Sequence, residues 1–234
     1  MSSRDAILAK LRAARRPFED APPRPSAYLP VTVQDDLSTD ALIERFSAEL
    51  TRLMGTTLVV NGDDEARAAV IDLLKKHEAK RILSWDFAHI PVRGLKEAIE
   101  SAGIDILYPE PYTGDREAML HLAEGAQVGL TGADAAAATT GTLIVTTAPG
   151  KGRIPTILPP VLISVISLDQ LLPRIESWFA RLREADPKMS GITNSANFCL
   201  ITGPSRTGDI EMELILGVHG PGTQYVVIKK TEDA

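Results

Sequence analysis

The chain of 234 residues has very little cysteine, because Cys199 is its only one. A single cysteine excludes an intramolecular disulfide, and it excludes a zinc or iron–sulfur site built from clustered thiolates of this chain alone. The histidines are scattered, without the paired spacing of zinc ligands: His77, His89, His121 and His219. We therefore expect no metal site and no cofactor bound by this chain alone, and we interpret Cys199 as a small buried strand residue.

Long apolar runs are also lacking. The longest one, residues 154–168, contains three prolines, and it is shorter than the roughly 20 residues of a membrane-spanning helix. The N-terminal segment has no apolar core followed by a small-residue cleavage site, so we expect no secretory signal. The formal charge is −6 and positive runs are short, which argues against nucleic-acid binding. These absences predict a soluble, cytoplasmic protein without a membrane span.

The first 55 residues differ in pattern from the rest. Apolar spacing predicts a helix over residues 3–16, and the five prolines of residues 16–30 indicate a linker. A second amphipathic helix is predicted over residues 36–55, with Ser38 or Thr39 as its N-cap. We therefore predict two parts, an N-terminal helical arm with its linker over 1–55 and an α/β domain over 56–234.

Strands and helices alternate after residue 55. Three short apolar runs, at residues 56–62, 80–86 and 104–110, are each followed by an amphipathic helix. Such alternation predicts right-handed β–α–β units and a mostly parallel sheet with helices on both faces.

The remaining sequence adds further predicted elements. Residues 135–140 and 142–147 are predicted as antiparallel strands that reverse at Gly141. A buried strand at 159–167, a long helix at 168–185, and a closing strand–helix–strand over residues 197–230 complete the α/β prediction, with the last helix at 209–216.

The strongest candidate for a functional site is the segment TGPSRTGDIE, residues 202–211, which follows a predicted strand. Ligands of open α/β sheets bind at the carboxyl ends of strands, and helix N-termini bind anions. Arg206 offers a planar fork for a carboxylate or phosphate, while Ser205 and Thr207 offer hydroxyl groups. The alternative interpretation is that Ser205 or Thr207 simply caps the predicted helix.

Three acids in the same region, Asp209, Glu211 and Glu213, would repel a dianionic phosphate. They favour a ligand with hydroxyl groups or a single carboxylate. His219 follows the predicted helix, whose eight or so residues would span about 12 Å. We therefore expect His219 to lie away from Arg206, as a histidine stabilised by the C-terminal end of the helix dipole.

A second group of candidates lies in the glycine-rich residues 131–153, where Lys151 and Arg153 could meet an anionic substrate. A glycine-rich β-turn with exposed cations explains this pattern equally well. Trp85, Asp86 and His89 fall where the second predicted strand ends and could line a site there. The alternative for Trp85 is that it covers the edge of the sheet.

Several motifs together resemble one known family. The segments TGTL, PGKGR, ILPPV, TGPSRTGDIE and GVHGP look like those of the lactate utilization protein C family, which contains the LUD domain. The resemblance implies a fold similar to sugar-phosphate isomerases, glucosamine-phosphate deaminases and coenzyme A transferases. It also implies a role in oxidising L-lactate to pyruvate beside iron–sulfur partner proteins, which would hold any clusters.

This chain departs from the family where an acidic residue often precedes a small turn, because it has Thr139 there. Asp134, Asp209 or Glu211 would then have to serve in its place. The candidate catalytic residues are therefore Arg206, Asp209, Glu211 and Asp134. The candidate substrate-binding residues are Gly141, Thr142, Lys151, Arg153, Gly203, Ser205 and Thr207.

Three functions fit these observations. The first is a component of a lactate utilization system that positions a small carboxylate substrate or assists assembly. The second is an independent isomerase, acyl-transfer or ligase-type enzyme, which rests on fold analogy. The third is a non-catalytic scaffold whose loops form an interface.

Overall fold

The computed structural model describes residues 3–14, 37–109, 116–208 and 214–230. The chain divides into two compact units, residues 1–34 and 35–234. In the first, α1 (Ser3–Ala14) is an exposed helix with Asp5 in its first turn and Arg12 in its last. The second unit holds all the other described elements, including α2 (Thr39–Arg52), whose N-terminus is capped by the side chain of Ser38.

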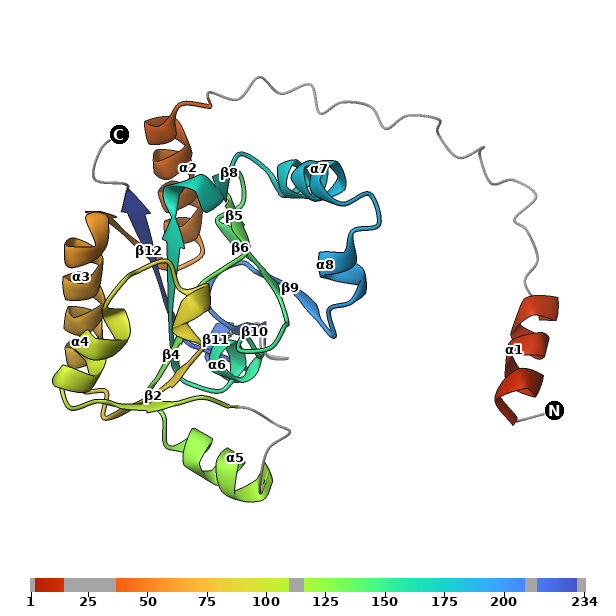
Figure 1. Ribbon diagram of the computed structural model, residues 1–234, viewed down its shortest axis with the longest axis horizontal. Coiled ribbons are helices and arrows are strands. Elements are labelled where there is room, and N and C mark those ends of the chain that lie inside the picture. Colours follow the sequence, from red (N-terminus) through yellow and green to blue (C-terminus); the bar gives the residue numbers. More distant parts are fainter. Residues whose placement is uncertain (1–2, 15–36, 110–115, 209–213, 231–234) are drawn as a thin grey trace. The chain divides into compact units, whose positions relative to one another are not determined.

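The second unit is built on a parallel sheet, drawn in Figure 1. Within the described residues its six strands run in the order β1-β12-β7-β4-β2-β3, and every neighbouring pair is parallel. Their bounds are β1 Thr56–Asn61, β2 Arg81–Ser84, β3 Asp105–Leu107, β4 Val128–Thr131, β7 Val161–Ser167 and β12 Thr223–Lys230. The predicted α/β fold with a mostly parallel sheet is confirmed.

Helices cover both faces of this sheet. Consecutive residues of a strand point to opposite faces, so neighbouring residues of β2 show which helices lie on each face. Ile82 of β2 belongs to the main core with residues of α3 (Gly62–Lys76) and α4 (Leu95–Ser101), which pack together. The next residue, Leu83, packs with residues of α5 (Arg116–Glu124) and α6 (Ile154–Ile157). The helices that follow β1 and β2 therefore occupy one face, and those that follow β3 and β4 occupy the other. The chain changes face between the neighbouring strands β2 and β4.

A smaller, four-stranded sheet follows β4 in the chain. Its order is β8-β5-β6-β9, with β5 Ala135–Ala137, β6 Thr142–Thr146, β8 Leu171–Leu172 and β9 Phe198–Ile201. The predicted antiparallel reversal between β5 and β6 is confirmed, and Gly141 has a φ of +60° at the turn. Helix α7 (Ile175–Ala185) covers this sheet with Trp178, whose ring stacks on Phe198 with centroids 5.6 Å apart. A short helix, α8 (Ser190–Thr193), joins α7 to β9.

Two sequence-based predictions about helices are wrong. The long helix expected over 168–185 begins only at Ile175, because a 3₁₀ turn, η2 (Leu168–Gln170), and strand β8 precede it and β8 pairs with β5. The helix expected over 209–216 is contradicted by β11 (Leu214–Leu216), which pairs antiparallel with β10 (Arg206–Gly208). Residues 209–213 lie outside the described residues. Strand β9 joins the smaller sheet, so the expected closing strand–helix–strand is wrong as well.

One buried side chain of the main sheet lacks hydrogen-bond partners. Gln224 of β12 is 1% exposed, and neither its Nε2 nor its Oε1 has a partner among the described residues. The hydroxyl of Thr57, on the neighbouring strand β1, is also buried without a partner. A buried amide without partners lowers stability by the cost of removing it from water, about 1–3 kcal/mol.

Replacing this amide with a side chain of similar shape should therefore stabilise the protein. We expect Gln224→Met to raise the free energy of unfolding in urea by about 1 kcal/mol. The matched control is Gln127→Met, which should lower it, because Oε1 of Gln127 accepts hydrogen bonds from the backbone of Lys80 and Arg81 at 3.0 Å each. A loss of stability in Gln224→Met would mean that ordered water satisfies the amide.

Candidate functional site

A hollow lies at the carboxyl ends of β2 and β4, where the helices change face. Such a switch point is the usual ligand site of open α/β sheets. The hollow has a volume of about 280 Å³, at the small end of the range for ligand pockets. Its lining comes from four separate stretches of sequence: Trp85, Ala88, His89, Pro91, Ala133, Asp134, Lys151 and Gln170.

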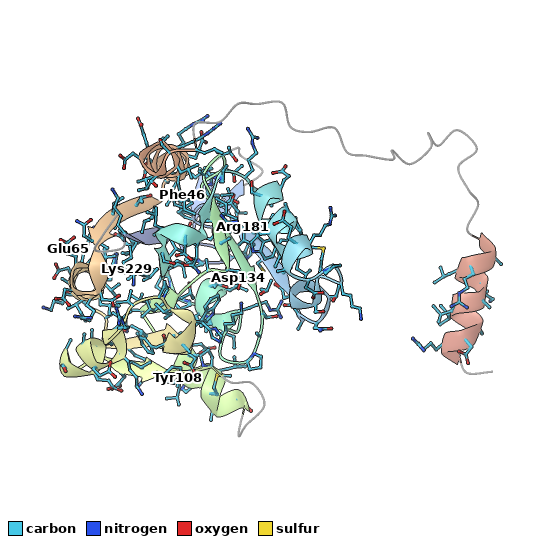
Figure 2. All side chains as sticks on the ribbon, turned by 45° about the horizontal axis from the view of Figure 1, so that its top comes forward. Phe46, Glu65, Tyr108, Asp134, Arg181 and Lys229 are labelled. Atoms are coloured by element: carbon cyan, nitrogen blue, oxygen red, sulfur yellow. The ribbon has the colours of Figure 1, made fainter. Side chains whose placement is uncertain are left out.

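The charged centre of the hollow is the ion pair between Lys151 and Asp134. Lys151 is 9% exposed, and its Nζ donates to Oδ1 of Asp134 and, at 3.1 Å, to Oγ1 of Thr146. The other oxygen of Asp134 accepts the backbone N–H and the hydroxyl of Thr146, at 2.5 and 2.8 Å. Asp134 is labelled in Figure 2. Both oxygens of the Asp134 carboxylate are therefore used to hold Lys151 and the base of the β5–β6 hairpin.

The ammonium group of Lys151 keeps one donor for a ligand. An ammonium group has three N–H donors, and the contacts to Asp134 and Thr146 use two of them. Nζ also lies 5.9 Å from the ring centroid of Trp85, which lines the hollow. Trp85 is held in turn by a hydrogen bond of 2.8 Å from its Nε1 to the carbonyl of Gly152.

His89, the last residue of the 3₁₀ turn η1 (Phe87–His89), lines the same hollow as the ion pair. Its Nε2 lies 3.1 Å from the carbonyl oxygen of Pro149. A carbonyl only accepts, so Nε2 carries the proton, and in the neutral ring Nδ1 keeps a free lone pair. Among the described residues Nδ1 has no hydrogen-bond partner. His89 is thus able to accept a proton from a bound ligand.

Glycine backbone sets the distance between the two sides of the hollow. A Cβ on Gly132 would lie 2.1 Å from the carbonyl oxygen of His89, so η1 rests directly on the chain that leads to Asp134. Gly150 has a φ of +76°, and a Cβ there would lie 2.9 Å from Cβ of Asp86. Asp86 bonds through its backbone N–H to the carbonyl of Gly150, and its carboxylate caps η1.

The sequence of the chain matches known proteins over most of its length. The model of the LUD domain matches residues 43–228. The chain belongs to the LUD domain family. It is 31% identical to lactate utilization protein C of Geobacillus sp. (strain WCH70), over 84% of this chain and 82% of that protein. Identity to lactate utilization protein C of Exiguobacterium sp. (strain ATCC BAA-1283 / AT1b) is 32%, over 82% and 79% of the two chains.

A solved structure has the same fold as this LUD domain. The crystal structure of a DUF162 family protein from Deinococcus radiodurans superposes with a TM-score of 0.59 at 22% identity. The match covers 83% of this chain and 99% of that chain. At this identity the match concerns the fold alone. The family predicted from the sequence motifs is confirmed by the match to the LUD domain and its relatives.

The candidate residues chosen from the sequence do not meet at one place in the LUD domain. Asp134 and Lys151 lie together in the hollow. Gly141 and Thr142 lie elsewhere, since a Cβ on Gly141 would touch α2 and Thr142 bonds to the hydroxyls of Thr140 and Thr202. Thr139 donates its backbone N–H to the carbonyl of Pro173, and Arg153 is exposed before α6.

The described part of the segment TGPSRTGDIE, residues 202–208, does not line the hollow. Arg206 is exposed on β10, next to Thr207 on the same strand. Gly203 packs on the end of α2, because a Cβ there would lie 2.8 Å from Cβ of Leu53. The backbone of Ser205 bonds to both Gly217 and Pro221, so the GVHGP loop lies beside it. Asp209 and Glu211 lie outside the described residues.

The placing of His219 was argued from a helix that the structure does not contain. His219 is exposed in the loop bonded to Ser205, and Leu216, three residues earlier, pairs with Arg206. No helix therefore separates His219 from Arg206, and the expected separation is wrong in its premise.

The sequence argument did not select two residues that shape the hollow. Thr146 contacts both members of the ion pair, and Gln170 donates from Nε2 to the carbonyl of Ala133 at 2.6 Å. Oε1 of Gln170 accepts from the backbone of Ser167, in a capping box that the Ser-x-x-Gln spacing does signal. The spacing does not indicate that Nε2 of the same side chain donates to the carbonyl of Ala133, the residue before Asp134.

Among the residues that the structure describes, no three His, Cys, Asp or Glu side chains lie close enough together to hold a metal ion. No helix among them is long and apolar enough to cross a membrane.

The ion pair predicts that substitutions at Lys151 and Asp134 have non-additive effects on the free energy of unfolding. We expect Lys151→Met to lower the free energy of unfolding by about 3 kcal/mol, because it leaves a largely buried carboxylate unpaired. Adding Asp134→Leu should restore part of this loss, a coupling that urea unfolding of the double-mutant cycle measures. Lys188→Met, at an exposed lysine, is the control and should change little. Simple additivity of the two changes would contradict a functioning pair.

Proposed function

We propose that the hollow between β2 and β4 binds a small 2-hydroxy or 2-oxo acid, L-lactate or pyruvate, within a cytoplasmic lactate utilization system. The observation that carries this proposal is the remaining N–H donor of Lys151 in a hollow of about 280 Å³. A lysine held in place by Asp134 and Thr146 can pair with one carboxylate. The naming of the relatives as lactate utilization protein C agrees with such a ligand.

His89 supplies the second contact that lactate oxidation needs. Conversion of lactate to pyruvate breaks the O–H bond of the hydroxyl group and the C–H bond at C2 and forms the C=O bond; the hydroxyl hydrogen leaves as a proton, and the C2 hydrogen leaves with the electron pair to a redox group of a partner protein. Nδ1 of His89 can accept that hydroxyl proton once the carboxylate is paired with Lys151. Asp134 is then a positioning residue, because its oxygens already hold Lys151 and Thr146.

The electrons must leave through other proteins. One cysteine cannot hold an iron–sulfur cluster, so the proposal assigns the clusters, and with them the electron acceptor, to iron–sulfur partner proteins. The LUD domain contributes substrate positioning and a proton acceptor.

The proposal is tested by growth and by binding. A strain without the gene should fail to grow on L-lactate, and wild-type protein or Lys188→Met should restore growth. His89→Gln should bind L-lactate within about threefold of wild type by calorimetry yet fail to restore growth, because Gln cannot accept the proton. Lys151→Met should bind L-lactate and pyruvate at least tenfold more weakly.

Normal growth of the deletion strain on L-lactate would overturn the role in lactate utilization. Unchanged lactate binding by Lys151→Met, in protein shown to be folded by circular dichroism, would overturn the assignment of the site.

A second observation supports the proposed partner proteins. The ribbon of β10 and β11 exposes three consecutive apolar residues, Leu214 at 57%, Ile215 at 44% and Leu216 at 38%. A two-stranded ribbon is marginally stable without a covering layer, and exposed apolar patches mark interaction surfaces. We propose that this ribbon, with Arg206 on β10, contacts an iron–sulfur partner.

Charged substitutions on the ribbon should weaken that contact. Leu214→Lys with Leu216→Lys should reduce binding of the purified iron–sulfur proteins by about tenfold or more. The matched control is Leu122→Lys, an exposed leucine on α5. Equal binding by the ribbon variant and the control would remove the ribbon from the interface and leave the proposed substrate site untouched.

A further inference from the structure

A second and larger hollow lies beside the first. Its volume is about 440 Å³, and its lining runs along residues 87 and 90–97 and includes Lys229 at the carboxyl end of β12. The chain from η1 to Pro91 contributes to both hollows, with Phe87 in the larger, His89 in the smaller and Pro91 in both. Lys229 and Asp134, which belong to different hollows, are both labelled in Figure 2.

Two cations of the larger hollow are held by one carboxylate. Oδ1 of Asp63 pairs with Nζ of Lys229 at 2.6 Å, and Oδ2 pairs with Nε of Arg93 at 2.9 Å. The hydrogen bond from Lys229 is the main cause that lowers the pKa of Asp63, so its carboxylate stays ionised. Asp63 lies in the first turn of α3 and thus fixes where both cations line the hollow.

These cations keep donors for a ligand. The contact of Arg93 to Asp63 uses Nε, and its side chain is 96% exposed. The terminal nitrogens of its guanidinium group have no partner among the described residues, and such a group is suited to binding two oxygens of an anion. Lys229 is 17% exposed and spends one contact on Asp63, so further N–H donors remain at its Nζ.

The charges favour a ligand with one negative charge. Three cations line the hollow, Arg93, Lys96 and Lys229, together with Glu97. Asp63 pairs with Arg93 and Lys229, and Glu100 pairs with Lys96 at 3.8 Å, so three cations face three carboxylates. A single carboxylate or singly charged phosphate ester then adds one negative charge to a neutral group, whereas a dianion adds two and is disfavoured.

The rest of the lining is apolar. Ile90, Val92 and Leu95 are buried members of the main core, and Phe87 packs edge-on against Tyr108 with centroids 6.4 Å apart. Because these three side chains are at most 5% exposed, the half-buried Phe87 and Pro91 supply the apolar surface that a ligand can contact. A small apolar surface beside a cationic rim suits a ligand with a short apolar body and an anionic end.

We propose that this larger hollow binds an organic monoanion with a short apolar body, through Arg93, Lys96 and Lys229. The site is distinct from the small-acid site at Lys151 and does not depend on it, since the two share only Pro91. The LUD domain then has room for two ligands at the same edge of its sheet, separated by η1.

The test compares three probes of the same size, benzoate, phenyl phosphate and the uncharged benzamide, titrated into the full-length protein at low salt and followed by NMR chemical shifts. Benzoate should shift the signals of residues 90–97, and benzamide should bind at least fivefold more weakly. Phenyl phosphate, titrated at pH 5 and pH 8, tells whether the site prefers a phosphate monoanion or a carboxylate.

Arg93→Gln combined with Lys96→Gln should weaken benzoate binding by about tenfold. Both side chains are exposed, and unchanged thermal stability will show that the fold persists. Lys188→Gln is the matched control. Lys151→Met should leave benzoate binding unchanged, so a failed lactate site and a failed monoanion site are distinguishable. No benzoate binding by the wild type, equal binding of benzamide, or full benzoate binding by the double variant would each overturn the proposal.

Discussion

The contact of η1 with the backbone at Gly132 determines the geometry of the whole carboxyl edge of the sheet. The carbonyl of His89 approaches so closely that no side chain fits between the two segments. The turn after β2 is thereby fixed against the chain that enters the smaller sheet. This contact also fixes the segment from η1 to Pro91, which contributes to the lining of both hollows.

The two sheets have different tasks in this arrangement. In the parallel sheet, the central strands β4 and β7 are buried and largely apolar. Its carboxyl edge supplies the sites. The smaller sheet holds the functional charges in register, since Asp134 precedes β5, Thr146 ends β6 and Lys151 follows within the next turn. The carboxylate of Asp134 contacts both Thr146 and Lys151, and these contacts hold the base of the hairpin rigid at the place where a ligand would bind.

Much of the fold could be predicted from the sequence, because the alternation of apolar runs and amphipathic helices is a local signal. Strand order is not local. Nothing in the run of residues 80–86 indicates that β4 rather than β1 lies beside it, and the hollow exists only because β2 and β4 are neighbours. Lys151 and Asp134 could be selected by residue type, but their pairing follows from the β5–β6 hairpin, and the place of His89 in the same hollow depends on the neighbour relation of β2 and β4.

For the segment TGPSRTGDIE and the residues that follow it, a local sequence pattern led to a wrong prediction of a helix. Its polar residues and its position after a strand favoured a helix N-terminus, and an amphipathic period seemed to continue through Leu214 and Leu216. That reasoning assumed a buried face for the apolar residues. In the structure all three residues of β11 are exposed, so burial gives a helix no advantage, and pairing with β10 satisfies the backbone instead. A sequence pattern cannot tell an apolar face that is buried within the chain from one that is left open.

The glycine contacts around η1 also restrict how this edge can change over time. Where two backbones touch, substitution of a side chain cannot widen or narrow the gap, because any atom added at Gly132 meets the carbonyl of His89. The backbone spacing between η1 and the chain before Asp134 is then inherited as a unit, while Ala88, an exposed residue of the lining, stays open to replacement. Related proteins that differ in ligand would be expected to differ at such lining side chains, and to keep the frame between them.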